Sequence, residues 1–140
     1  MRQWLLSLAL VAVAGCPRSD GPEAVIWDRE ACAQCRMHIG DPRFAAQLQT
    51  ARGEVRNFDD PGCLFEHLEE QRPEVKRLWF HHRAEERWLP GERAAFAEEA
   101  KTPMGHGLAA VDPGTPGAIP LAAARQRTLE RRASRRQARP

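Results

Sequence analysis

The sequence predicts one small domain in which short strands are combined with a clearly marked helix. Residues 44–50 and 55–58 have the pattern of two strands joined by an Arg-Gly turn, which is typical of a hairpin. Residues 61–71 follow an aspartate, begin with a proline and precede another proline, as expected for a helix with a defined start and end. Once residues 1–15 are set aside as a leader, the remaining length favours a single modest core.

The other expected elements are short. Residues 102–107 contain one proline and two glycines, and we therefore predict a loop there. Residues 94–100 have short helical character. Further strands are expected at residues 24–27, 75–82, 88–89 and 108–111.

The first residues predict a lipoprotein. Arg2 precedes a mostly apolar run that ends near Val13, and this run is shorter than the roughly 20 residues needed to cross a bilayer. The run leads into Val-Ala-Gly-Cys, the pattern of a lipobox. We therefore expect residues 1–15 to be a signal peptide, Cys16 to be lipidated and residues 16–23 to be a tether. The mature protein would be anchored to a membrane outside the cytoplasm; an ordinary signal peptide with a chance cysteine is the alternative.

Charge divides the remaining chain into two parts. Residues 17–120 carry 13 basic and 18 acidic side chains, whereas residues 121–140 carry seven arginines and one glutamate. We expect a domain at residues 24–111, followed at residues 112–140 by a Pro/Gly linker and an Arg-rich tail. This basic C-terminal tail has few large apolar residues, and we predict that it is disordered. A lipoprotein outside the cytoplasm rarely meets nucleic acid, so no nucleic-acid partner is expected.

The strongest candidate site is the segment from Cys32 to Met37. Cys32 and Cys35 are separated by two residues, a spacing that brings two thiolates within reach of one ion. Met37 adds a thioether, and soft sulfur ligands select copper(I). A redox-active disulfide between the two cysteines, as in a thiol–disulfide reductase, is an alternative. Cys63 is the remaining cysteine of the mature domain besides Cys16, and this odd number argues against a purely structural disulfide framework.

Two weaker clusters follow. Met104 and His106 place a thioether and an imidazole in the glycine-containing loop. Cys63 and His67 lie one helical turn apart, and with Cys32 and Cys35 they would form a Cys₃His zinc site; this structural zinc domain is a second alternative. The Asp-Asp pair before the helix is interpreted as a helix cap. No nucleotide-binding loop or nucleophile elbow is present, and we predict a binding protein, not an enzyme.

Several of these motifs, in this order, resemble the NosL family of copper-binding lipoproteins associated with nitrous oxide reductase maturation. The matching segments are the lipobox at Cys16, Cys-Ala-Gln-Cys-Arg-Met-His-Ile at 32–39, Phe-Ala-Ala-Gln at 44–47, the stretch 53–64, Trp79, Trp88-Leu89 and Thr-Pro-Met-Gly-His-Gly-Leu-Ala-Ala at 102–110.

The resemblance implies an α+β domain of two ββαβ-like halves, the second shortened here because its end is rich in proline and glycine. It also implies one copper(I) ion, with Met104 as the first ligand and Cys32, Cys35, Met37 and His106 as the others. The implied function is that of a membrane-tethered metallochaperone. Its partner would be apo nitrous oxide reductase or its copper-assembly complex, and the process would be denitrification in the periplasm.

Overall fold

The computed structural model describes residues 20–139. The predicted signal peptide, the lipobox and Cys16 lie outside the described residues. Within residues 20–139, no helix combines the length and the apolar composition that a membrane span requires.

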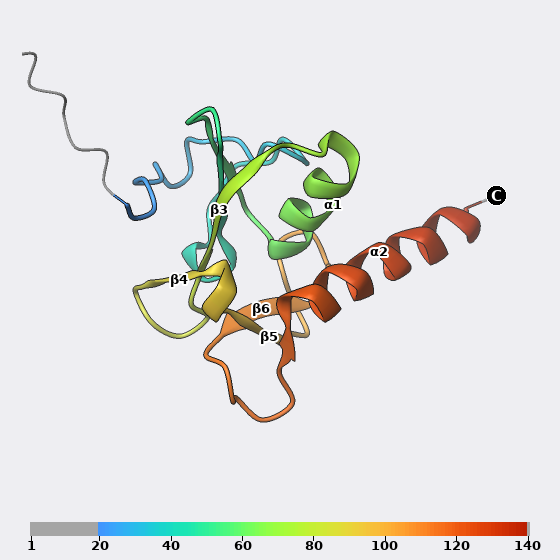
Figure 1. The fold of residues 1–140 in the computed structure, drawn as a ribbon. Helices are drawn as coiled ribbons and strands as arrows, with labels where there is room; N and C mark the ends of the chain where they lie inside the picture. The colour runs from blue at the N-terminus through green and yellow to red at the C-terminus, as the bar shows by residue number, and fades with distance from the viewer. Residues whose placement is uncertain (1–19, 140) are drawn as a thin grey trace, which may run out of the picture.

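The first part of the fold is a four-stranded antiparallel sheet with one helix (Figure 1). Its strand order is β2-β1-β3-β4. The helix α1 follows β2 and precedes β3, so it connects the two strands that flank β1. The strands and the helix are β1 (Ala46–Thr50), β2 (Val55–Phe58), α1 (Pro61–Gln71), β3 (Val75–His81) and β4 (Trp88–Pro90). The predicted hairpin and helix are confirmed, and β1, β2, α1 and β3 form a ββαβ unit.

The helix α1 begins where its sequence predicts. Asp60 is the N-cap, and its carboxylate accepts a hydrogen bond from the Gly62 amide at 2.9 Å. Pro61 occupies the first turn, where a missing N–H costs nothing. Arg72 ends the helix in the left-handed conformation, with φ of 45°. The carboxyl group of the neighbouring Asp59 is consequently not engaged in this cap.

The second part is a smaller three-stranded sheet with the order β6-β5-β7, followed by a helix. Its β7 strand precedes the helix, and no strand follows the helix within the described residues. The second half is therefore a shortened version of the first, and the α+β class is confirmed. The elements are β5 (Ala95–Glu98), β6 (Leu108–Val111), β7 (Ile119–Pro120) and α2 (Leu121–Gln137); short 3-10 turns lie at Pro42–Phe44 and Gly91–Arg93.

One core lies between the two sheets and α1. Phe65 of α1, Phe80 of β3 and Phe96 of β5 contact one another, with ring centroids 4.9 to 5.8 Å apart. Such aromatic contacts stabilise the core beyond simple burial. The sheets are also joined by backbone pairing, because the Arg83 amide donates to the Ala110 carbonyl at 2.8 Å. The two halves are therefore packed as one unit.

Three predictions about elements are wrong. Residues 24–27 are not a strand, and residues 95–98 form a strand where helical character was expected. The basic tail is not disordered, because residues 121–137 form α2, which lies against α1 (Figure 1). Ala124 and Thr128 of α2 are completely buried. The buried contact of α2 is thus made by small side chains. The scarcity of large apolar residues in this segment therefore did not indicate it.

Candidate metal centre

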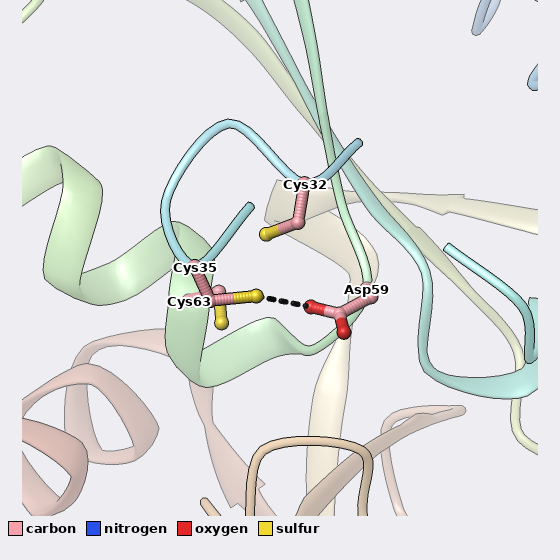
Figure 2. Close-up of side chains that lie close together, drawn as sticks. All are labelled: Cys32, Cys35, Asp59 and Cys63. Atoms are coloured by element: carbon pink, nitrogen blue, oxygen red, sulfur yellow. Dashed lines mark hydrogen bonds between the residues drawn. The ribbon is translucent and has the colours of Figure 1, made fainter. Parts of the chain in front are cut away.

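Three cysteines and one aspartate converge beside the first turn of α1 (Figure 2). One ligand atom from each of Cys32, Cys35, Asp59 and Cys63 lies within 4.8 Å of the others. Cys32, Cys63 and Asp59 are buried, whereas Cys35 is partly exposed. The group could hold a metal ion, and Cys35 is its partly open side.

The Cys-x-x-Cys segment is held by its own backbone. The Cys32 amide donates to the Met37 carbonyl at 2.8 Å, and the Arg36 amide donates to the Cys32 carbonyl at 3.1 Å. The loop is joined to β2 because the Ala33 amide donates to the Asn57 carbonyl at 2.9 Å. Cys32 and Cys35 are thereby placed next to the segment that leads from β2 into α1.

Asp59 and Cys63 come from that segment. Asp59 directly follows β2, and the Cys35 thiol donates a hydrogen bond to its carboxylate at 3.4 Å (Figure 2). Cys63 lies in the first turn of α1. Asp59 is not among the ligands predicted from the sequence, because the Asp-Asp pair has the pattern of a helix cap. Only one of two adjacent aspartates can be the N-cap residue, so the other one, Asp59, was available for a different role.

Crowding four acidic groups in a buried space changes where protons reside. A hydrogen bond from the Cys63 thiol lowers the pKa of Cys32 to about 5. That same hydrogen bond, together with burial, raises the pKa of Cys63 far above its ordinary range. Burial raises the pKa of Cys35 to about 12 and the pKa of Asp59 to about 6. At neutral pH the metal-free group therefore carries negative charge on Cys32 and on Asp59, and a cation would replace the remaining thiol protons.

His106 is the fifth side chain at this place. Its Nε2 atom lies 3.9 Å from the Cys63 sulfur, and its side chain is buried. Gly62 makes this position possible: a Cβ atom at residue 62 would lie 2.0 Å from the His106 Cγ atom. The glycine before Cys63 thus provides the space into which the imidazole packs.

The predicted ligands fall into two groups. Cys32 and Cys35 are brought together in the cysteine group, and His106 lies next to that group beside Cys63. Met37 and Met104 are exposed, at 59% and 39% of their surface, and the structure establishes no ligand role for either. The Met104 backbone is nevertheless near the site, because its amide donates to the Asp60 carboxylate at 3.2 Å.

The proposed Cys₃His zinc set does not form around His67. The His67 ring packs against Phe58, with centroids 5.1 Å apart, and lies 2.9 Å from an Arg56 nitrogen and 3.3 Å from a Gln34 oxygen. Cys63 belongs to the cysteine group, but its neighbour one turn later does not. All three cysteines of the described chain are free, so no Cys32–Cys35 disulfide is present.

A second group joins His82, Glu85 and Asp112. Here Arg87 donates to Glu85 at 2.7 Å and to Asp112 at 2.5 Å. The guanidinium of Arg87 thus already neutralises both carboxylates. We therefore interpret this group as a set of salt bridges and not as a metal centre.

Comparison with known proteins supports the fold. No family model and no curated protein matches the sequence. Among solved structures, the chain matches the crystal structure of the copper chaperone NosL from Shewanella denitrificans with a TM-score of 0.51. The match covers 79% of this chain and 87% of that chain, at 18% sequence identity. The resemblance drawn from the motifs is therefore confirmed at the level of the fold: the chain folds as NosL does.

Proposed function

We propose that this protein is a membrane-tethered copper(I)-binding protein that delivers its ion to another protein, and that it is not an enzyme. The observation that carries the proposal is the buried group of Cys32, Cys35, Cys63 and Asp59, with His106 beside it. Copper(I) is the cargo of such a protein.

The side chains fit copper(I) by their chemistry. Three thiolates and an imidazole are ligands that soft or borderline ions prefer, and they bind copper(I) as well as zinc. Copper(I) is proposed over zinc because of the motif resemblance and the fold shared with a copper chaperone. Asp59 is a poorer ligand for copper(I), but its carboxylate accepts a hydrogen bond from Cys35 and thereby orients that thiol. Thiols must lose their protons to bind metal, and the Cys32 pKa of about 5 leaves one thiolate ready at neutral pH.

The partly exposed Cys35 supports a role in transfer rather than in permanent storage. A cargo ion must be reached by a partner, and a completely buried group would prevent this. Met104 and Met37 remain candidate ligands on the outer side, because thioethers bind copper(I) and both side chains are accessible.

The proposed client is apo nitrous oxide reductase or its copper-assembly complex. The proposed place is a membrane surface outside the cytoplasm, on the periplasmic side or at the cell surface, with the lipid on Cys16. The client is carried over from the motif resemblance to the NosL family. The fold shared with a protein described as a copper chaperone supports copper delivery without naming a client, and the lipobox sequence supports the membrane anchor. Replacing Cys16 with serine should leave unprocessed precursor in the membrane; normal release of a soluble mature form would contradict the anchor.

The central test is competition for copper(I) with a chromogenic chelator under anaerobic conditions, using the mature domain. We expect one copper(I) per chain, bound far more tightly than zinc. Cys63→Ser should weaken binding strongly, by about 100-fold or more, because it removes a central thiolate. His67→Ala is the matched control on the same helix and should bind like wild type. Met104→Ala reports separately whether the thioether is a ligand.

The outcomes separate the alternatives. Zinc that copper(I) cannot displace would identify a structural zinc site built on the same cysteines. Isolation of the protein with a stable Cys32–Cys35 disulfide and no metal would favour a thiol–disulfide reductase. Loss of copper binding in His67→Ala but not in Cys63→Ser would refute the site described above.

A further inference from the structure

The loop that carries His106 is fastened to the rest of the protein at several points. This loop, residues 102–107, connects β5 to β6 and will be called the His106 loop. On the α1 side, its Met104 amide donates to Asp60, the residue that also caps α1. Within the loop, the Gly107 amide donates to the Thr102 hydroxyl at 3.2 Å. The Gly107 carbonyl in turn accepts from the Glu99 amide at 3.0 Å. These contacts hold both ends of the loop but leave the His106 carbonyl to be bound from elsewhere.

Arg131 of α2 provides that contact. One guanidinium nitrogen donates to the His106 carbonyl at 2.9 Å, and another pairs with Glu98 of β5 at 3.1 Å. The loop backbone is shaped for this approach: Gly107 has φ of +74°, and a Cβ atom there would lie 3.0 Å from the same guanidinium. The arginine therefore reaches a backbone atom of the residue whose ring contacts Cys63.

The helix that bears Arg131 is itself fixed against α1. Arg132 forms an ion pair with Glu70, and Arg125 forms another with Glu69 at 3.0 Å. Buried Ala124 and Thr128 add packing on the same face of α2. Cys63 lies on α1 and Arg131 lies on α2. Because these two helices pack against each other, the Arg131 guanidinium and the Cys63 sulfur keep a fixed relative position.

We propose that Arg131 is a positioning residue for the metal centre, which holds His106 against Cys63 from the C-terminal helix. This inference rests on the proposed function. According to this proposal, α2 contributes a positioning residue to the site and is not only a basic segment. Loss of the Arg131 contact would release the His106 carbonyl, so the imidazole would leave the Cys63 sulfur more often and the bound ion would dissociate faster.

The test compares Arg131→Ala with Arg127→Ala in the mature domain. Arg127 is the matched control, because it lies one turn earlier on α2 and pairs with the same Glu98 at 2.9 Å without bonding to the His106 loop. The first measurement is the rate at which copper(I) passes to excess chelator. We expect Arg131→Ala to speed this transfer by about five- to tenfold, as for loss of a charge-assisted hydrogen bond at a partly exposed position. Arg131→Lys should recover part of the effect, and Arg127→Ala should change little.

A second measurement asks whether Arg131 acts through His106. In a His106→Ala background, Arg131→Ala should cause no further acceleration, because the group it positions is gone. An equal acceleration in both backgrounds would show a general structural role and overturn the proposal, as would equal rates for Arg131→Ala and Arg127→Ala.

A third measurement needs no metal and separates this inference from the proposed function. In metal-free protein, alkylation of Cys63 can be followed by peptide mapping. The raised pKa of Cys63 keeps the absolute rate low, because only the thiolate is alkylated. Arg131→Ala should still increase that rate several-fold over Arg127→Ala, because the imidazole that lies 3.9 Å from the Cys63 sulfur moves away. If copper(I) fails to bind but this difference is present, the positioning role stands and the copper function fails. If Cys63 reacts equally in both variants, the positioning role is wrong even when copper binds tightly.

Discussion

Gly62→Ala is the sharpest test of the arrangement at the start of α1. A Cβ atom at this position would lie 2.0 Å from His106 Cγ, 2.4 Å from His106 Cβ and 2.5 Å from His106 Cδ2. These distances are far shorter than the roughly 3.5–4 Å of favourable carbon contacts. The imidazole must therefore leave the position in which its Nε2 atom lies 3.9 Å from the Cys63 sulfur.

Two opposing effects set the size of the loss in stability. Alanine is favoured over glycine in a helix interior by about 1 kcal/mol. Forcing extra volume into a packed site costs about 1–3 kcal/mol, so the two effects together predict a net loss of up to about 2 kcal/mol for Gly62→Ala. Chemical denaturation of the metal-free protein measures this difference. Gly21→Ala is the control, since a Cβ atom there meets nothing within 4 Å.

The His106→Ala background makes the prediction decisive. With the imidazole removed, the clash disappears and only the helix preference remains, so Gly62→Ala should change from destabilising to neutral or stabilising. The single variant should also bind copper(I) about as weakly as His106→Ala. An equal loss of stability in both backgrounds would refute the reasoning, because the clash would then involve something other than His106.

Two further predictions follow from the acid–base properties of the site. The Asp59 pKa is raised to about 6, so its ionised form is disfavoured in the fold; this penalty is present above that pH and absent below about pH 4. In chemical denaturation of the metal-free protein, Asp59→Asn should therefore increase stability by an amount on the order of 2 kcal/mol at about pH 8 and by little at about pH 3.5. The same substitution should weaken copper binding. An equal change in stability at both pH values would contradict this prediction. Copper(I) affinity should fall as pH drops from about 8 to about 6, with release of roughly two protons per ion, because Cys35 and Cys63 hold their protons in the metal-free state. Affinity independent of pH in the chelator competition would mean that thioethers, not thiolates, hold the ion.

The parts of the fold that could be predicted from the sequence depend on short-range rules. The helix Pro61–Gln71 follows from an aspartate cap, a proline in the first turn and a proline after its end. The pairing of Cys32 with Cys35 follows from their spacing. By contrast, α2 is held by pairs between distant charges, such as Arg132 with Glu70 and Arg125 with Glu69. Local composition shows only the arginines, so the same segment is read as a charged, mobile tail.

The candidate site likewise has one part that follows from local sequence and another part that depends on tertiary contacts. Spacing finds two cysteines in one loop, but the addition of Cys63 and Asp59 requires β2 to lie beside that loop, which is a tertiary contact. The thioether of Met37 predicts a soft site in this loop, but the Met37 side chain is exposed and its backbone carbonyl accepts a hydrogen bond from the Cys32 amide. Residue type and spacing therefore indicate the segment that carries the site better than they indicate which of its side chains face the site.

The first turn of α1 explains why these separate features meet. Asp60 caps the helix with one carboxylate oxygen and binds the His106 loop with the other. Gly62 leaves the space for the imidazole, and Cys63 presents its sulfur at the same turn. The pattern Asp-Asp-Pro-Gly-Cys thus performs more than helix initiation: the second aspartate and the glycine organise the loop that approaches the cysteine. The same five residues, joined to a Cys-x-x-Cys loop, would be expected to organise a thiol-rich centre in other chains of this fold.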